Sequence, residues 1–183
     1  ALAGASMMVN PFSPPSSPSG SNRTLPATAE VASSVGSAAA ATQAPREEIR
    51  ILAGRPAGRY IDQDGLSWEG DQYVTGGLAR PVTVEVNTRG LDPNIFSGMR
   101  EGIFQYDIPL KAGVYELLLL FAETSEQVKH PGGRPGRLFA VLANNVPLVQ
   151  EYDALAEALD PSTATARRFR GVSPGPDGKL HLS

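Results

Sequence analysis

The stretch FQYDIPLKAGVYELLLLFAE, from Phe104 to Glu123, decides the fold. Its first part, FQYDIPL, alternates apolar and polar side chains, which is the period-2 pattern of a strand with one wet face. A turn is predicted at Lys111-Ala112-Gly113. The next part, VYELLLLFAE from Val114, is apolar on both faces, and this pattern is typical of a central strand in a sheet.

Working outward, further segments have strand character, and turn residues lie between them. They are IRILAG (Ile49 to Gly54), the alternating Val82 to Val86, RLFAVLA (Arg137 to Ala143), VPLV (Val146 to Val149) and GKLHLS (Gly178 to Ser183). Asn144-Asn145 suits a tight hairpin because asparagine tolerates left-handed backbone geometry. Only YDALAEAL (Tyr152 to Leu159) could be helical, and Pro161 would end the helix, so a short turn of helix or an ordered loop is expected there. The spacing predicts an all-β antiparallel sandwich.

Composition excludes several functional classes. The formal charge of −3 and the pI near 5.4 provide no basic field for nucleic acid or for an anionic membrane surface. The chain has no cysteine, which rules out disulfides and Cys-based zinc sites. We predict no cofactor.

The N-terminal segment, residues 1–45, has a different composition from the rest. Up to Ala44 its only charged side chains are Arg23 and Glu30, among Ala, Ser, Pro, Gly and Thr. Such a stretch buries too little apolar surface to offset its ordering entropy, so we predict a disordered or extended tail that acts as a stalk. The opening ALAGASMMV resembles the end of a signal peptide or transmembrane helix, with an ordinary apolar terminus as the alternative. This tail predicts an extracytoplasmic location, with membrane contact only through a missing N-terminal anchor.

These motifs, together with DQDGLSWEGDQYVTGG from Asp62, resemble the malectin domain in order and spacing over Ile49 to Ser183. The resemblance implies that residues 46–183 form a galactose-binding-like jelly roll that recognises carbohydrate through its loops. Bacterial members are similar domains on secreted or membrane-anchored proteins. Family members continue past the position of Ser183 with a final apolar strand that carries an acidic ligand. We therefore expect a sandwich that lacks this strand, and a truncated chain or a strand supplied from elsewhere would each account for it.

The resemblance also proposes site residues, since sugar sites pair stacking aromatic rings with carboxylates, amides and arginine. The family's tyrosine in the Trp-containing loop matches Tyr73. The family's aromatic pair after the FAE motif is replaced by Ser125-Glu126, and another of its aromatics falls at Glu101, or at Met99 in an alternative alignment. The candidate carbohydrate-binding residues are Trp68, Asp71, Tyr73, Arg100, Glu123 and Glu126.

Each candidate has a structural alternative. Trp68 would plug one end of the sandwich, with Tyr73 packed beside it. Glu123 would cap backbone amides, and Arg100 would be a solvated surface residue. The insertion VKHPGGRPGR (Val128 to Arg137) would contact an acidic glycan or simply be a long solvated loop.

Metal binding and catalysis have little support. Asp62-Gln63-Asp64-Gly65 begins like a calcium loop, but the later ligands of such a loop do not follow, and an Asx-turn is the alternative. His130 lacks the partners of a metal site. Asp107 and Glu123 could form a pair of carboxylates, yet the strand positions of both explain them without catalysis. We predict no metal site and no enzymatic activity.

Two functions from different classes follow. The first is a non-catalytic carbohydrate-binding module, displayed on the cell envelope or secreted, whose partner is a glycan or oligosaccharide. The alternative is a structural or assembly module of a surface appendage, which would self-associate or bind a partner strand at an exposed sheet edge.

Overall fold

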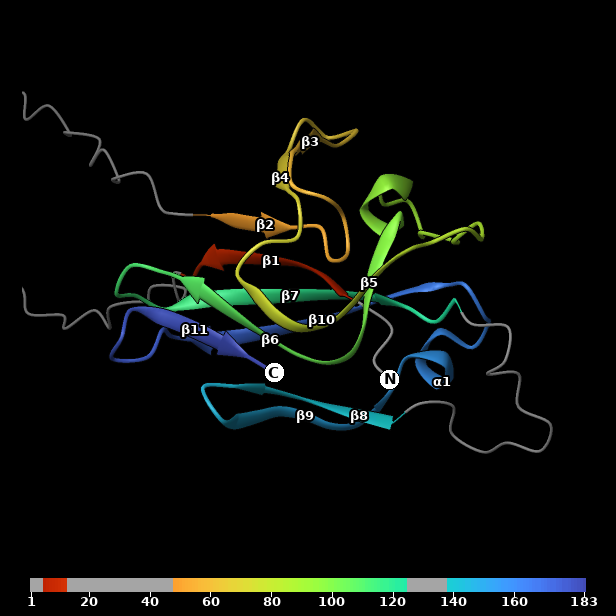
Figure 1. Ribbon diagram of the computed structural model, residues 1–183. Coiled ribbons are helices and arrows are strands. Elements are labelled where there is room, and N and C mark those ends of the chain that lie inside the picture. Colours follow the sequence, from red (N-terminus) through yellow and green to blue (C-terminus); the bar gives the residue numbers. More distant parts are fainter. Residues whose placement is uncertain (1–4, 13–47, 125–137) are drawn as a thin grey trace, which may run out of the picture.

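The computed structural model describes residues 5–12, 48–124 and 138–183, which form two packed β-sheets (Figure 1). One sheet, called sheet A, contains β1 (Ala5–Pro11), β2 (Ile49–Ile51), β3 (Arg59–Ile61), β4 (Ser67–Glu69), β7 (Tyr115–Ala122) and β10 (Ala164–Val172). The other, sheet B, contains β5 (Val74–Pro81), β6 (Gly98–Pro109), β8 (Leu138–Ala143), β9 (Val146–Asp153) and β11 (Lys179–Leu182). A 3₁₀ turn, η1 (Pro93–Phe96), and a short helix, α1 (Ala154–Ala158), complete the described elements.

The strand order is β10-β7-β1-β2-β4-β3 in sheet A and β5-β6-β11-β8-β9 in sheet B. Neighbouring strands pair antiparallel, with a parallel bridge between β2 and β4. The all-β, antiparallel sandwich predicted from the sequence is confirmed.

The strand β7 is central, as its sequence predicts. It pairs with β10 on one side and with β1 on the other. Leu117, Leu119 and Phe121 point into the core between the sheets, while Leu120 and Ala122 belong to a second cluster on the outer face of sheet A. Burial on both faces explains why nearly every residue of this strand is apolar.

The outer cluster of sheet A is covered by the chain between β2 and β5 and by η1. Trp68 of β4 and Ile95 and Phe96 of η1 pack against Leu120. Ser6 of β1 is buried beneath this layer, and its hydroxyl donates to the carbonyl of Ile95 at 2.7 Å. The Trp68 side chain thus closes the outer face of sheet A, whereas the structural alternative placed it at one end of the sandwich.

The first strand corrects the prediction of a tail over residues 1–45. Residues 5–11 form β1, which lies inside sheet A between β2 and β7, so these residues are part of the sandwich and not of a tail. Met7 and Val9 are 3% and 0% exposed in the core between the sheets. The prediction of a tail rests on composition, which indicates that this segment buries too little apolar surface to be ordered. The error arose because the partners that bury β1 lie far away in the sequence, on β2 and β7.

The rest of the predicted tail, residues 13–45, lies outside the described residues. Because β1 occupies the position between β2 and β7, each of these strands is paired on the side that faces β1. That the family's final strand is missing stays a prediction. Within the described ranges, the structure contains no helix long and apolar enough to cross a membrane.

Local predictions have mixed outcomes. Asn144 and Asn145 both have positive φ, 49° and 66°, at the hairpin between β8 and β9, as predicted. The predicted turn of helix is α1, which Asp153 caps at its N-terminus and the left-handed Leu159 ends. The alternating segment 82–86 is not a strand, however, and of its three valines Val86 packs against the outer cluster of sheet A.

Candidate functional site

Asp71 and Arg100, two of the predicted ligand residues, are brought into direct contact. The Arg100 guanidinium donates to Asp71 Oδ2 from Nε at 2.9 Å and from Nη2 at 2.7 Å. Tyr106 Oη donates to Asp71 Oδ1 at 2.6 Å, and the backbone amide of Gly54 donates to Oδ2 at 2.7 Å. Arg100 Nη1 also donates to the carbonyl of Gly76 at 2.6 Å.

This cluster ties the segment after β2 to the middle of sheet B. The side chains of Asp71 and Arg100 are only 4% and 13% exposed. Burial, followed by the negative charge of Asp71, raises the pKa of Tyr106 well above its usual range, so the phenol remains a donor to Asp71. The Asp71 carboxylate and the Arg100 guanidinium are therefore both occupied by structural contacts.

Trp68 cannot offer a stacking face, because it is 1% exposed. Its indole Nε1 donates to Asp62 Oδ2 at 2.8 Å, and the amides of Asp64 and Leu66 donate to Asp62 Oδ1. Burial of Asp62 opposes its ionisation, but these three hydrogen bonds outweigh the burial and hold its pKa below the usual range. The prediction that Trp68 binds sugar is corrected, and an Asx-turn is present where the calcium-like motif begins.

The remaining candidates differ in accessibility. Tyr73 is 41% exposed, has a φ of 61°, and accepts a hydrogen bond at its carbonyl from the amide of Asp107. Its ring is the accessible aromatic surface among the predicted ligand residues that the structure describes. Glu123 is 5% exposed directly after β7, and its carbonyl accepts from the amide of Ser162. Glu126 and the insertion at 128–137 lie outside the described residues.

The two carboxylates considered as a catalytic pair are placed on different sheets. Asp107 lies in β6 of sheet B, while Glu123 follows β7 of sheet A. Asp107 Oδ1 accepts a hydrogen bond from Gln105 Nε2 and is also hydrogen-bonded to Nδ1 of the His181 imidazole. Asp107 thus has the strand position that the sequence predicted, whereas Glu123 lies just after the end of a strand.

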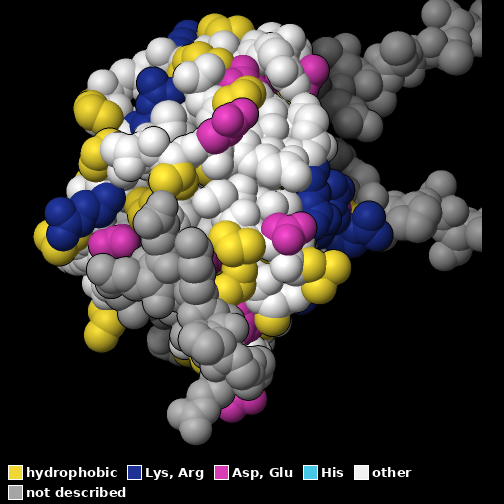
Figure 2. Space-filling view, turned by 90° about the vertical axis from the view of Figure 1, so that its right-hand side faces the viewer, with side chains coloured by type: hydrophobic (Ala, Val, Ile, Leu, Met, Phe, Trp, Pro, Cys, Tyr) yellow, Lys and Arg dark blue, Asp and Glu magenta, His cyan; other side chains and the backbone are white. Residues whose placement is uncertain are grey.

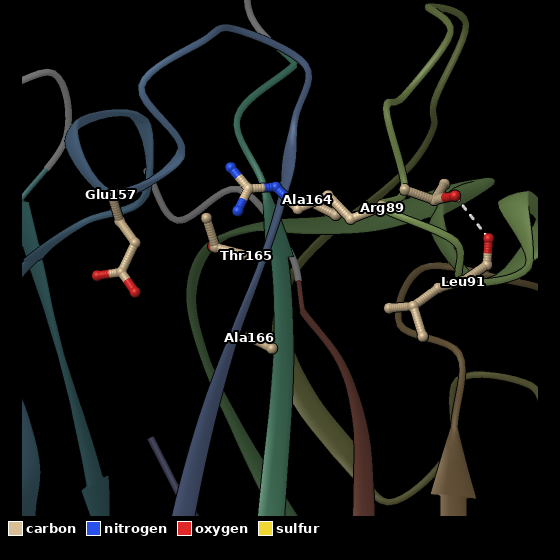
Figure 3. A pocket seen from close by; sticks show the side chains of 7 residues that line it. Arg89, Leu91, Glu157, Ala164, Thr165 and Ala166 are labelled. Carbon is tan, nitrogen blue, oxygen red and sulfur yellow. Dashed lines mark hydrogen bonds between the residues drawn. The ribbon is translucent and has the colours of Figure 1, made fainter.

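A cavity of about 320 Å³ lies at the end of the sandwich where β7 ends and β10 begins (Figure 3). Its walls are Thr88, Arg89, Leu91, Glu157 and residues 164–166. They come from the loop after β5, from α1 and from β10. The walls thus combine a guanidinium, a carboxylate and hydroxyls with small alanine side chains that leave room for a ligand.

Each polar wall residue is held in place by a contact. Arg89, with a φ of 53°, donates from Nη2 to the carbonyl of Ala158 at 3.0 Å. Glu157 pairs with Arg167. Thr165 Oγ1 lies 2.8 Å from Tyr152 Oη, which orients the hydroxyl. Both Arg89 and Glu157 keep further hydrogen-bonding capacity, because a guanidinium has five N–H donors and a carboxylate accepts at two oxygens.

The surface around this end of the sandwich is polar. Figure 2 shows it with basic and acidic side chains among scattered hydrophobic ones, and no continuous apolar patch is visible among the coloured side chains of this face. A ligand here would be recognised by hydrogen bonds more than by apolar contact.

The sequence reasoning did not find this cavity. The wall residues 88–91 lie more than sixty residues before Glu157 and residues 164–166, and nothing in their spacing marks them as one site. The only local signal is NTRGLDP, from Asn87 to Pro93, a turn-rich segment with an arginine at its centre. Positive φ at Arg89 and Gly90 shows that the backbone there is held in an unusual shape.

The model of the malectin domain matches residues 49–172. The chain belongs to the malectin domain family. The malectin domain is a carbohydrate-binding domain, so the chain has a carbohydrate-binding fold. The match includes the cavity residues and the Asp71–Arg100 cluster, whereas β1 and β11 lie outside it. A search of curated proteins finds no match.

Among solved structures, the malectin sandwich is similar to part of a Bacteroides uniformis β-glucuronidase, with a TM-score of 0.58 and 19% sequence identity. The similarity covers 73% of this chain and 16% of the β-glucuronidase chain. At this identity the similarity concerns the fold alone.

A second polar cluster lies on sheet B around His181. Its Nδ1 is 2.6 Å from Asp107 Oδ1 and its Nε2 is 3.0 Å from Asp177 Oδ2. The hydrogen bond with Asp107 raises the pKa of His181, and hydrogen bonds from Gln105 and His181 lower the pKa of Asp107. The arrangement favours an imidazolium between two carboxylates.

The His181 cluster predicts a pH-dependent stability. Because its folded pKa is raised above 6.5, His181 stabilises the fold fully below that value and loses its contribution as pH rises through the folded pKa. Asp107 acts oppositely, and loses its contribution as pH falls through its lowered pKa. The urea concentration at the midpoint of unfolding should therefore decrease as the pH rises from about 6 to about 8.

His181→Gln should flatten this fall, and NMR titration of the wild-type imidazole should give a midpoint above 6.5. His130→Gln is the matched control, since His130 is the other histidine of the chain. An equal flattening by both variants would contradict the assignment to His181.

Proposed function

We propose that the chain is a non-catalytic carbohydrate-binding module whose sugar site is the cavity between Arg89 and Glu157. Membership of the malectin domain family supports the ligand class. The cavity supports the place, because it is polar, concave and framed by loops at the end of the sandwich. The observation that carries the proposal is the presence of a guanidinium and a carboxylate on opposing walls, as Figure 3 shows.

The chemistry of this cavity suits a saccharide. A sugar ring presents neighbouring hydroxyls, each of which both donates and accepts. Arg89 can donate to a pair of hydroxyl oxygens, and Glu157 can accept from a pair of hydroxyl hydrogens. Ala164 and Ala166 leave space above β10, while Leu91 offers an apolar wall to the C–H face of a ring. A volume of about 320 Å³ is at the lower end of the range for ligand pockets, and this suits one or two sugar units.

The location also belongs to the proposal. We place the module outside the cytoplasm, on the cell envelope or secreted, because bacterial malectin domains are domains on secreted or membrane-anchored proteins. Labelling of intact cells with a membrane-impermeant reagent tests this. A protein labelled only after lysis would overturn the location and leave the ligand class untouched.

The test of the ligand is a glycan array with the full chain, followed by calorimetry on the best binder. Arg89→Ala and Glu157→Gln should each weaken binding by about 10- to 100-fold, because each removes charge-assisted hydrogen bonds worth about 1.5–3 kcal/mol. Both variants should keep the wild-type thermal transition to within a few degrees, since each side chain lies at the rim of the sandwich.

Arg59→Ala and Glu69→Gln are matched controls. These two residues form an exposed ion pair on β3 and β4, at the edge of sheet A opposite β10, so the variants should bind like the wild type. Equal affinity in Arg89→Ala, Glu157→Gln and the controls would contradict the cavity as the site. If Tyr73→Ala alone weakened binding, the site would lie at the start of β5.

A further inference from the structure

The first strand has an unusual relation to the rest of the domain. It lies outside the family-matched residues 49–172, yet it occupies a central position in sheet A (Figure 1). Residues 5–11 pair antiparallel with residues 115–121 of β7, and Met7, Met8 and Val9 pair with 49–51 of β2. The remainder of the domain thus forms a groove for one strand between β2 and β7, and β1 fills it.

The contacts in this groove are specific to one register. Met7 and Val9 reach the core between the sheets, whereas Ser6 and Met8 face the outer cluster. A shift by one residue would exchange these faces, and a polar serine would then enter the core in place of an apolar side chain. The sequence SMMV therefore fits this groove in the observed register.

The connection between β1 and β2 is far longer than their geometry requires. Val9 lies directly opposite Ile49 in an antiparallel pair, and two residues suffice to join such neighbours. Residues 13–47 join them instead. A connection of this length raises the local concentration of β1 at its own groove only to about the millimolar range.

We propose that the groove between β2 and β7 is a strand acceptor and that β1 of a second copy of this chain occupies it in an exchanged dimer. In such a dimer each sandwich keeps every contact of β1, because the exchanged strand has the same sequence and register. The two states then differ only in the entropy of the connection. Crowding of copies to about millimolar local concentration shifts the population toward exchange.

The absence of cysteine in the chain permits a direct test with single labels. One preparation carries a donor at Ala1→Cys, next to β1, and another carries an acceptor at Ala57→Cys, an exposed position between β2 and β3. The two are mixed in denaturant and refolded together at increasing protein concentration. Energy transfer between chains and a species of twice the mass should appear together and increase toward about millimolar protein.

A hairpin variant is the control. Residues 12–46 are replaced by Asn-Gly, which places Pro11 opposite Glu47 and continues the observed register into a two-residue turn. Because its own β1 is fixed beside β2, this variant should fold, remain a monomer and show no energy transfer at any concentration.

Two results would overturn the proposal. One is a wild-type chain that refolds without energy transfer at every concentration tested. The other is equal transfer in the wild type and the hairpin variant, which would assign the association to another surface. Neither result bears on sugar binding, because the cavity is built from residues 88–91, α1 and β10, and glycan affinity is measured separately.

Discussion

Val9→Asp should lower the free energy of unfolding by about 3–5 kcal/mol, although the residue lies in a segment whose composition resembles a disordered tail. Val9 is fully buried, between Leu117 on β7 and Ile49 on β2. A carboxylate there has no partner, so it must be protonated at a cost or β1 must leave the sheet. The loss is bounded by the smaller of these two costs. Urea unfolding, followed by the fluorescence of Trp68, the single tryptophan, measures it.

Val146→Asp is the matched control for this prediction. Val146 begins β9 beside the Asn144-Asn145 hairpin and is 62% exposed, so the same substitution should change stability by less than about 0.5 kcal/mol. If the Val9 and Val146 variants unfolded at the same urea concentration as the wild type, β1 would not belong to the sandwich.

Asp71→Ala should be nearly as damaging, with a loss of about 3–5 kcal/mol. The substitution removes the partner of the Arg100 guanidinium, whose side chain is 13% exposed, and leaves a buried charge without compensation. It also removes the acceptor of Tyr106 Oη and of the Gly54 amide, and these donors would have to find water. The same unfolding experiment measures this loss.

Two variants separate the contributions to the effect of Asp71→Ala. Asp71→Asn keeps an acceptor and the shape of the side chain but not the charge, so its loss should be intermediate. Asp64→Ala, at an exposed aspartate in the same segment, should have almost no effect. If Asp71→Ala abolished glycan binding at unchanged stability, Asp71 would be a ligand residue, as the sequence proposed.

The parts of the fold that the sequence predicted correctly are those with local causes. The apolar run of β7 requires burial on both faces wherever it is placed. The Asn144-Asn145 pair adopts left-handed geometry, and α1 has a capping residue before it. Each of these signals is contained within about ten residues, so it can be read without knowledge of the packing.

The strand β1 and the segment 82–86 show why the remainder could not be predicted. The β1 sequence is short, uncharged and followed by a Pro- and Ser-rich stretch. It forms a strand because it pairs with the apolar strands β2 and β7 on either side. The opposite error occurred at 82–86, where alternation was present but no neighbouring strand was available. In both cases the tertiary partner decides the structure, not the local pattern.

The candidate site was only partly within reach of the sequence. The resemblance brought Asp71 and Arg100 into consideration, and the structure does place them together. The sequence could not reveal that Asp71 and Arg100 satisfy each other's charge and hydrogen bonds. A charged pair in a core and a charged pair in a ligand site have the same composition. The cavity at Arg89 and Glu157 depends on the meeting of the loop after β5 with α1 and β10, which follow more than sixty residues later, and no spacing rule links them.

The position of β1 has a consequence for synthesis on the ribosome. Residues 5–11 emerge before the other strands of the sandwich, but their partner strand β7 follows only after roughly a hundred further residues, so the central pairing of sheet A cannot form until β7 has been synthesised. During that interval the apolar SMMV segment has no native neighbour. The nascent chain is then exposed to aggregation or to chaperone capture at β1, and the rate of elongation through residues 13–114 sets how long this vulnerability lasts.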